Sequence, residues 1–291
     1  METALPQAHV RPKTAARRRV FMPGRWLLYA ALIAGAAIMT FPFYWMLATS
    51  VKTLVEALLF PPSLWPREWH PENYLQAWRL APFARYFVNT ILIAVAQVVA
   101  LLVTSTLAAY AFARVSFVGK NLVFVLFLAT LMVPFEVTLV PNFIVLKNLG
   151  WYNTYLALIV PFSTSVFAIF LLRQFFLSIP QELYDAAQID GCSRFGFLWR
   201  IAVPLARPGL ITVALLAFLG AWNSFLWPLI MTGSEQMRVL QVGLSNFQSE
   251  AGTQYHLWMA AATFTILPIV VLYLIAQRYF VEAVAGSGIK G

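Results

Sequence analysis

The stretch from Pro180 to Pro204 holds the densest group of residues suited to specific contacts. Three acids, Glu182, Asp185 and Asp190, stand close together in it. Pro180 suits the first turn of a helix, and acids near a helix N-terminus are stabilised by the helix dipole. Carboxylates placed in this way suit polar or ionic contact with another surface.

Small residues divide this stretch into two predicted helices. Ala186 and Ala187 favour a helix and allow another surface to approach closely. Gly191 can supply the left-handed turn after the first helix, and Ser193 can cap a second helix that Pro204 helps to end. The apolar side of the second helix is predicted to comprise Phe195, Leu198, Trp199 and Ile201. Two short apolar helices in water need a partner that covers them.

Glu136 is an acid inside an otherwise apolar segment. A charge at mid-membrane costs about 2.5–3.5 kcal/mol on insertion scales, so the default interpretation is a functional site. Pro134 and Pro141 flank Glu136 and can break the helix near the outer face, where this cost falls. A role in lining or gating a pathway and a structural or interfacial role are both open.

Four other residues are candidates for a solute pathway. Asn89 and Gln97, together with Thr104, share one side of a predicted helix, which suits a small polar packing face better than a pathway wall. Trp222 and Asn223 place an aromatic face beside an amide, which suits sugar rings and hydroxyls. Tight helix packing explains this last pair nearly as well.

These residues are embedded in long apolar runs. The 291 residues are 61% hydrophobic and 11% charged, against about 45–50% and about 25% in soluble domains. Each run reaches the ~20 residues that a membrane-spanning helix needs, and none alternates as a barrel strand does. We therefore predict an all-α polytopic membrane protein with about six transmembrane helices, at residues 27–49, 86–113, 122–142, 155–179, 208–231 and 257–281.

The positive charges predict the orientation of these helices. With a cytoplasmic N-terminus, 14 of the 20 lysines and arginines fall inside and 6 fall outside. The positive-inside rule then places both termini in the cytoplasm. The stretch 180–207 becomes the long cytoplasmic loop, a helix-turn-helix, and residues 50–85 form an external loop with prolines and tryptophans.

Several function classes are excluded. The net charge of +9 reflects membrane orientation and contact with anionic lipid, so no nucleic-acid partner is expected. The three histidines lie in no ligand spacing, and no metal site is expected. Cys192, the single cysteine, cannot form an intramolecular disulfide. An intramembrane enzyme would need a nucleophile–base or metal pair inside the spans, and none is recognisable.

The cytoplasmic loop resembles the EAA loop of ABC-importer permeases, whose pattern is E-A-A-x3-G-x9-I-x-L-P. The matching positions are Asp185-Ala186-Ala187, Gly191, Ile201 and Val203-Pro204, with Asp for Glu and Val for Leu as departures. The resemblance covers most of the chain and is closest to carbohydrate-importer permeases of the maltose-permease G-subunit type. Supporting stretches are 41–45, 133–141, 222–229 and the tail 286–291.

The resemblance implies a coupling role. The loop would dock on a separate ATP-hydrolysing subunit, with Glu182, Asp185 and Asp190 in polar contact, Ala186 and Ala187 packed closely, Gly191 setting the turn, and Ile201 and Pro204 completing the motif. The chain lacks a G-x4-G-K-[ST] phosphate loop, so ATP and Mg belong to the partner ATPase, and this chain is expected to bind no cofactor. Further expected partners are a second permease, giving a heterodimer, and an extracytoplasmic solute-binding protein.

We therefore predict a non-enzymatic permease subunit for a carbohydrate or polyol, in the inner membrane of a bacterium or archaeon. The alternative is an ion-gradient-driven secondary transporter, for which only Glu136 offers a start. The predicted layout is a basic cytoplasmic arm (1–26), a first helix with external loop (27–85), a transmembrane core (86–281) that includes the loop 180–207, and a cytoplasmic tail (282–291).

Overall fold

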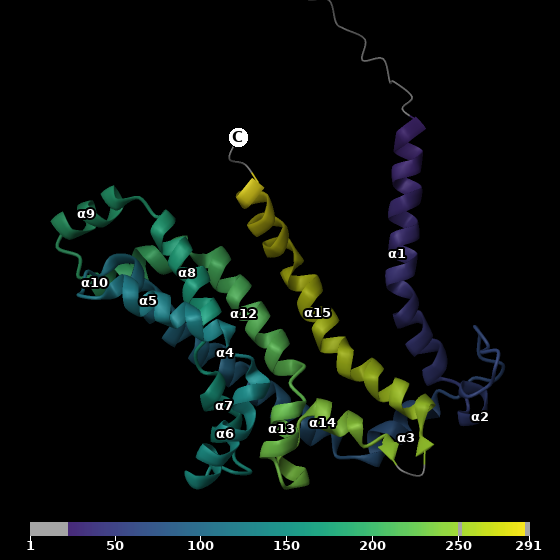
Figure 1. Cartoon of the computed structure of the whole chain (residues 1–291). Coiled ribbons are helices and arrows are strands. Elements are labelled where there is room, and N and C mark those ends of the chain that lie inside the picture. The colour runs from purple at the N-terminus through teal and green to yellow at the C-terminus, as the bar shows by residue number, and fades with distance from the viewer. Residues whose placement is uncertain (1–22, 250–251, 289–291) are drawn as a thin grey trace, which may run out of the picture. The chain divides into compact units, whose positions relative to one another are not determined.

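A computed structural model describes residues 23–249 and 252–288 (Figure 1). The described residues divide into two compact units, one ending at Trp45 and one beginning at Met46. In the described residues the regular elements are helices, apart from one antiparallel pair, β1 (Gln248–Ser249) and β2 (Gly252–Thr253). Most of the predicted basic arm (1–22) and the last residues of the tail (289–291) lie outside the described residues.

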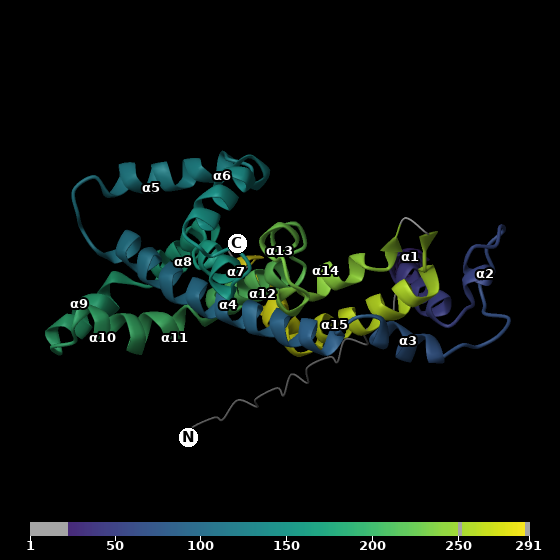
Figure 2. The same ribbon diagram turned by 90° about the horizontal axis from the view of Figure 1, so that it is seen from below.

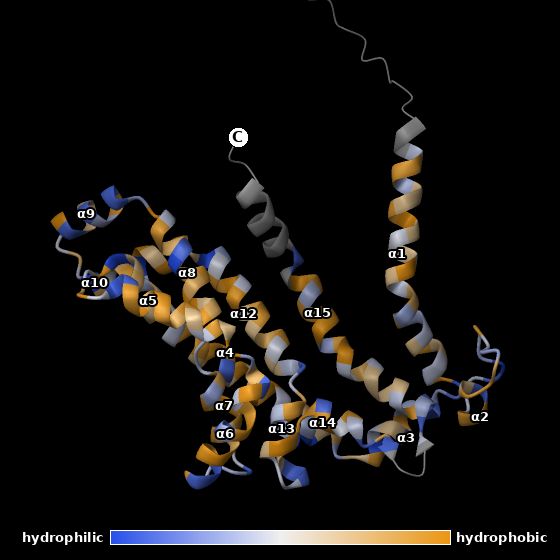
Figure 3. Cartoon of the chain, viewed as in Figure 1, coloured by the Kyte–Doolittle hydropathy of each residue, from blue (hydrophilic) through white to orange (hydrophobic). Residues whose placement is uncertain are grey.

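Three helices are long and apolar enough to cross a membrane: α1 (Pro23–Ser50), α4 (Phe83–Arg114) and α15 (Tyr255–Gly288). Three bent helix pairs also qualify, giving up to six spans within the described residues. Figure 3 shows apolar residues along α1 and α15 and many hydrophilic ones on α9 (Gln181–Ile189). The predicted all-helical, polytopic architecture is confirmed at this level, whereas the direction of the spans through a membrane stays a prediction.

The third predicted span is broken at Pro134. α5 (Lys120–Ala129) continues into η1 (Thr130–Met132), and α6 (Phe135–Asn148) leaves at 99°. Val133 is extended, because the residue before a proline is driven out of the helical region. Pro141 lies inside α6 and does not end it, so of the two expected breaks only the first is present.

The fourth span bends, and the fifth differs from the prediction. α7 (Tyr155–Ile159) and η2 (Val160–Phe162) meet α8 (Val166–Ser178) at 42°. The predicted fifth helix over 208–231 is wrong, because α12 (Arg207–Trp222) stops before Asn223 and α13 (Leu226–Met231) follows as a separate helix. The amide of Asn223 donates to the carbonyl of Leu219 over 2.9 Å, and this side-chain bond competes with continuation of the helix.

α4 lies at the centre of the second unit, packed against α8 and α12 (Figures 1 and 2). Leu172 and Phe176 of α8 and Phe197 beyond it are buried in the core at the Arg114 end of α4. Gly209 of α12 lets Phe175 of α8 approach closely, since a Cβ at position 209 would lie 2.4 Å from its ring. These helices therefore form the fixed frame from which the 180–207 stretch projects.

A hydrogen-bonded network organises the predicted external loop. Lys52 is buried and donates to the carbonyl of Ser63, and burial lowers the pKa of its amine. The carboxylate of Glu56 accepts from the Ser63 hydroxyl over 2.8 Å and from the Arg67 amide over 3.0 Å. Asn73 donates to the carbonyl of Lys52 over 2.8 Å. The remaining elements between the spans are α2 (Leu54–Ala57), α3 (Glu72–Leu80), η4 (Glu235–Met237) and α14 (Leu240–Ser245).

Candidate functional site

The stretch 181–205 forms a pair of short helices joined by a tight turn. α9 ends at Ile189, and Gly191 follows with φ of 77°, in the left-handed region expected of it. The Ser193 hydroxyl accepts from the Gly196 amide over 3.0 Å and so caps α10 (Arg194–Phe197). The chain continues through the π-helix η3 (Leu198–Ala202) and α11 (Val203–Leu205) into α12.

One side of the α9–α10 pair is packed against the transmembrane helices. Tyr184 and Ala187 of α9 are buried, and the Tyr184 ring lies edge-on to Phe197 with centroids 4.9 Å apart. Tyr110 of α4 packs edge-on to Phe176 and donates from its hydroxyl to the Arg194 carbonyl over 3.0 Å. Both short helices are thereby packed on the core at the Arg114 end of α4.

The other side of the pair is exposed. It combines acids with apolar side chains: Ile189 is 86% exposed and Phe195 is 62% exposed. We call this surface the docking face, and it comprises Glu182, Leu183, Asp185, Ala186, Ile189, Asp190, Phe195 and Trp199. Exposed acids and large apolar side chains on one surface suit contact with a partner.

The structure separates residues that the sequence had grouped. Ala186 is exposed, but Ala187 packs into the chain's own core. Close approach of another surface at Ala187 therefore stays a prediction. Leu198 is buried whereas Phe195 and Trp199 are exposed, so the predicted single apolar side of the second helix is wrong. The π-helical turn from Leu198 rotates successive side chains differently from an α-helix.

Ile201 and Pro204 of the motif lie where the stretch joins α12. Ile201 is half-buried against the inner core. Pro204 is exposed within α11. The chain bends by 78° between residues 194–205 and α12. Ile201 and Pro204 therefore lie just before this bend.

Two of the predicted pathway residues are fully engaged in packing. The amide of Asn89 donates to the carbonyls of Gln236 and Arg238, and its oxygen accepts from the Tyr155 hydroxyl over 2.8 Å. Trp222 is 1% exposed, and its indole nitrogen donates to the carbonyl of Thr265. Neither side chain lines a cavity described for this chain, so their role in a pathway stays a prediction.

Gln97 and Thr104 satisfy carbonyls at the bend of the fourth span. The Gln97 amide donates to the Leu158 carbonyl over 2.6 Å, and the Thr104 hydroxyl donates to the Ser163 carbonyl over 2.6 Å. A bent helix leaves backbone carbonyls without their helical partners, and in an apolar setting these need another donor. This explains the polar face of α4, although Gln97 also lines a cavity.

Glu136 and Asn223 are accessible. Glu136 is exposed in the first turn of α6, where the helix dipole stabilises a carboxylate. Asn223 is exposed at the end of α12, and its oxygen accepts from Gln241 over 3.4 Å. The structure therefore does not place Glu136 or Asn223 around one described cavity with Asn89 or Trp222.

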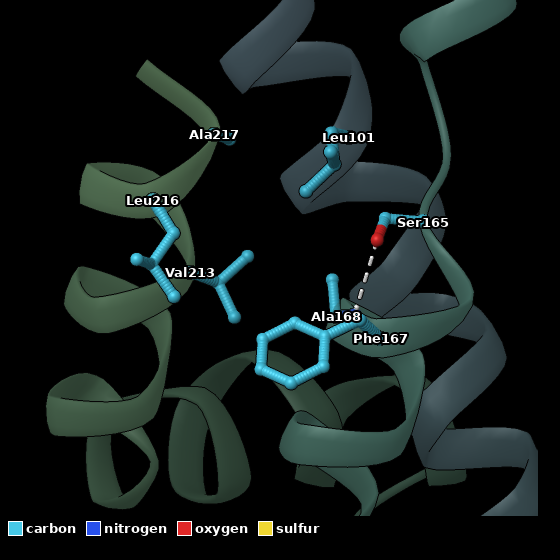
Figure 4. A pocket seen from close by; sticks show the side chains of 7 residues that line it. All are labelled: Leu101, Ser165, Phe167, Ala168, Val213, Leu216 and Ala217. Atoms are coloured by element: carbon cyan, nitrogen blue, oxygen red, sulfur yellow. Dashed lines mark hydrogen bonds between the residues drawn. The ribbon is translucent and has the colours of Figure 1, made fainter. Parts of the chain in front are cut away.

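A groove lies between α4, α8 and α12 (Figure 4). Two adjoining cavities of about 210 and 280 Å³ share Leu101, Ser165 and Ala217. The larger one is also lined by the polar Gln97 and Thr164 and by Gly220. The sequence reasoning missed Thr164, Ser165 and Gly220, although the hydroxyl run Ser163–Ser165 inside an apolar segment was a signal for them.

The residues that the structure describes contain no group of three or more His, Cys, Asp or Glu side chains arranged to hold a metal ion. The docking face and the groove present carboxylates, amides, hydroxyls and apolar surface.

A family model matches residues 102–286, which include the docking face, the α8 and α12 sides of the groove and most of α15. Its description is the inner membrane component of binding-protein-dependent transport systems. The chain belongs to this family. The permease is therefore a multi-pass inner-membrane transport component and no enzyme, as the sequence predicted, and the secondary-transporter alternative is not supported.

Curated relatives match the permease over nearly its whole length. It is 34% identical to the probable ABC transporter permease protein YurM of Bacillus subtilis, over 99% of this chain and 95% of the relative. It is 36% identical to the arabinooligosaccharides transport system permease protein AraQ of Halalkalibacterium halodurans, over 91% of this chain and 96% of the relative. The sn-glycerol-3-phosphate transport system permease protein UgpE of Yersinia enterocolitica is 33% identical, over 89% and 95%.

The fold of the permease also matches a solved transporter. A chain of a bacterial ABC transporter involved in import of the acidic polysaccharide alginate superposes with a TM-score of 0.78 at 23% identity, covering 88% of the permease and 97% of that chain. A second structure, of a bacterial alginate ABC transporter in complex with an alginate pentasaccharide-bound periplasmic protein, gives 0.64 at 17% identity, over 88% and 94%. The permease therefore shares its helical fold with chains of these two transporters.

Proposed function

We propose that the permease forms half of the translocation pathway of an importer for a carbohydrate or polyol, and that a separate ATPase drives it through the docking face. The observation that carries the proposal is the two-sided α9–α10 pair. Its inner side is packed on α4 and α8, and its outer side presents acids and apolar residues. A partner that moves the outer side moves the transmembrane helices with it.

The contacts to the ATPase divide by residue type. Asp185, Glu182 and Asp190 supply carboxylates, Ala186 gives close approach, and Ile189 with Phe195 supply the apolar area that an interface centre requires. Gly191, Ile201 and Pro204 set the direction of the chain. Ala187 packs the side of α9 opposite to the docking face on the core. ATP and Mg are held by the ATPase. The two ATPase states must hold the docking face in different positions, because equal binding would shift nothing.

We propose that the docking face lies in the cytoplasm together with both termini. The excess of lysine and arginine on that side supports this orientation. A solute-binding protein is expected on the outer side, and the alginate transporter solved with its periplasmic protein supports this. The second permease is proposed to be a different chain, and the membrane is proposed to be the inner membrane of a bacterium or archaeon.

The solute is proposed to pass the groove between α4, α8 and α12. Relatives named for arabinooligosaccharides and for sn-glycerol-3-phosphate support a polyhydroxylated solute. Gln97, Thr164 and Ser165 offer amide and hydroxyl groups beside Phe162, which line the larger cavity. Hydroxyls and an aromatic face suit a sugar better than an ion.

Co-purification with the ATPase tests the coupling proposal. The transporter is expressed with all its partner subunits, and Asp185→Arg is expected to reduce capture of the ATPase because it reverses the charge of the docking face. Ser178→Ala is the matched control, since its exposed hydroxyl donates only to the Phe175 carbonyl within α8. Normal capture and ATP-dependent uptake by the Asp185→Arg variant would contradict the proposal.

Uptake of a radiolabelled arabinooligosaccharide into proteoliposomes tests the pathway. Ala217→Trp fills the groove and is expected to abolish uptake while the ATPase stays bound. Asn223→Ala asks whether this exposed amide contacts the solute, and an unchanged KM and rate would remove it from the pathway. Uptake that survives Ala217→Trp would move the pathway away from the groove.

A further inference from the structure

Arg114, the last residue of α4, reaches three partners on another part of the chain. Its guanidinium donates to the carbonyls of Phe176 and Ile179 and, over 2.6 Å, to the side-chain oxygen of Gln181. The two carbonyls belong to the end of α8, where helix carbonyls lack helical partners and a positive charge is favourable. One side chain thus ties the inner end of α4 to the end of α8 and the start of α9.

Gln181 connects Arg114 to the docking face by hydrogen bonds. Its side-chain nitrogen donates to the carboxylate of Asp185 over 3.0 Å, while its oxygen accepts from Arg114. An amide can do both at once because it carries a donor and an acceptor. The guanidinium of α4 is therefore linked through one amide to the acid at the head of the D-A-A motif.

The chain between α8 and α9 leaves little freedom around this link. Ile179 and Pro180 are both extended, with ψ of 126° and 142°. Proline fixes its own φ and restricts the residue before it. One helical turn before Arg114, Tyr110 donates to the Arg194 carbonyl at the start of α10. The final turn of α4 thus holds α9 and α10 at separate points.

We propose that Arg114 and Gln181 are positioning residues that make α4 and the α9–α10 pair move as one body and aim Asp185 at the ATPase. This rests on the proposed coupling role of the docking face. A single contact would act as a pivot, about which α9 could turn without moving α4. The contacts at Gln181 and at Arg194 together prevent that turn, so displacement of the docking face reaches the helix that lines the groove.

The tether is measured by the distance between nitroxide labels at Ser116, just beyond α4, and Gln188 on α9, in a Cys192→Ala background that removes the single cysteine. Both labelled side chains are exposed. In the assembled transporter the wild-type distance distribution is expected to be narrow and equal in nucleotide-free and vanadate-trapped ATP states. Gln181→Ala is expected to broaden it, most in the trapped state. Ser178→Ala is expected to leave it unchanged.

Gln181→Glu separates the two halves of the link. A glutamate still accepts from Arg114 but places a carboxylate beside Asp185 in place of a donor. It is expected to keep the narrow distribution, whereas ATPase affinity falls about fivefold or more, the low end of coupling between sites. Arg114→Lys keeps the charge, but one ammonium cannot span the amide and both carbonyls, so an intermediate breadth is expected.

The proposal is overturned if Gln181→Ala gives the wild-type distribution in both states. It is equally overturned if the variant broadens the distribution only together with a lower melting temperature and loss of the second permease, because that identifies a purely structural role. Failure of the docking-face proposal looks different: the Asp185→Arg variant then captures the ATPase normally and supports ATP-dependent uptake. The effect of Gln181→Ala on the distance is still measurable in that case, because the tether lies within this chain.

Discussion

The ring of Tyr184 on α9 lies edge-on to the ring of Phe197 at the end of α10, with centroids 4.9 Å apart and planes at 87°. This contact packs the two short helices against each other, next to the core at the Arg114 end of α4. Phe197 is 1% exposed, whereas Phe195, two residues before it, is 62% exposed. The same residue type therefore serves packing at one position and the docking face at the other.

Phe197→Ala is expected to destabilise the permease by about 3–5 kcal/mol, because it removes a buried ring and leaves a cavity. Phe195→Ala removes an exposed ring and is expected to leave the melting temperature unchanged while it weakens ATPase capture. Thermal unfolding in detergent and co-purification measure the two effects. Equal melting temperatures for the two variants would show that Phe197 contributes no more to packing than Phe195.

Gly191→Ala is expected to cost about 1–2 kcal/mol, since a side chain disfavours the left-handed conformation. The cost is conformational and not steric, because a Cβ at Gly191 has nothing within 4 Å. Gly191→Asn is expected to be milder, as asparagine tolerates φ near 77° better than other residues do. Melting temperatures in the order wild type, Asn, Ala are predicted, and a reversed order of the two variants would contradict backbone strain.

Gly209→Ala is expected to destabilise the packing of α12 on α8. The new methyl would lie 2.4 Å from the Phe175 ring, and overpacking of this kind costs about 1–3 kcal/mol. Gly220→Ala on the same helix meets nothing within 4 Å and is expected to be neutral or to gain up to about 1 kcal/mol from helix propensity. A melting temperature for Gly209→Ala at or above that of Gly220→Ala would disprove the close approach.

His70 and Glu72 are expected to make stability depend on pH. The hydrogen bond from His70 Nδ1 to Glu72, over 2.7 Å, raises the pKa of His70 above its ordinary 6.5 and lowers the pKa of Glu72 below its ordinary 4.5. The His70 contribution is complete below pH 6.5 and is lost as pH rises through the raised pKa. The Glu72 contribution is complete above pH 4.5 and is lost as pH falls through the lowered pKa.

The corresponding measurement compares melting temperatures from about pH 6 to about pH 8.5. The wild type is expected to lose stability over this range relative to His70→Gln, by a small amount because the pair is partly exposed. Glu68→Gln is the control: its carboxylate lies 3.7 Å from His70 Nε2, so a smaller change is expected. Parallel pH profiles for the wild type and His70→Gln would contradict the link.

Composition and local sequence were sufficient to predict a membrane environment and the fold class, and to identify the motif. A backbone that spans a membrane forms helices or a closed barrel, so the helical architecture followed from the length of the apolar runs and from their lack of alternation. The turn at Gly191 and the cap at Ser193 were also predictable, because local backbone chemistry alone decides them. The motif spacing identified the permease family, which the match over residues 102–286 confirms.

Which side chains are free to act depends instead on the packing of the helices. Ala187, Asn89 and Trp222 are buried. No local sequence pattern distinguishes an amide that faces a cavity from one that donates to a distant carbonyl. The groove lined by Ser165 and Ala217 depends on how separate helices meet. The link from Arg114 through Gln181 to Asp185 crosses 67 positions at its first step. Burial and long-range hydrogen bonding are properties of the packed chain, so they could not be inferred from residue spacing along a single helix.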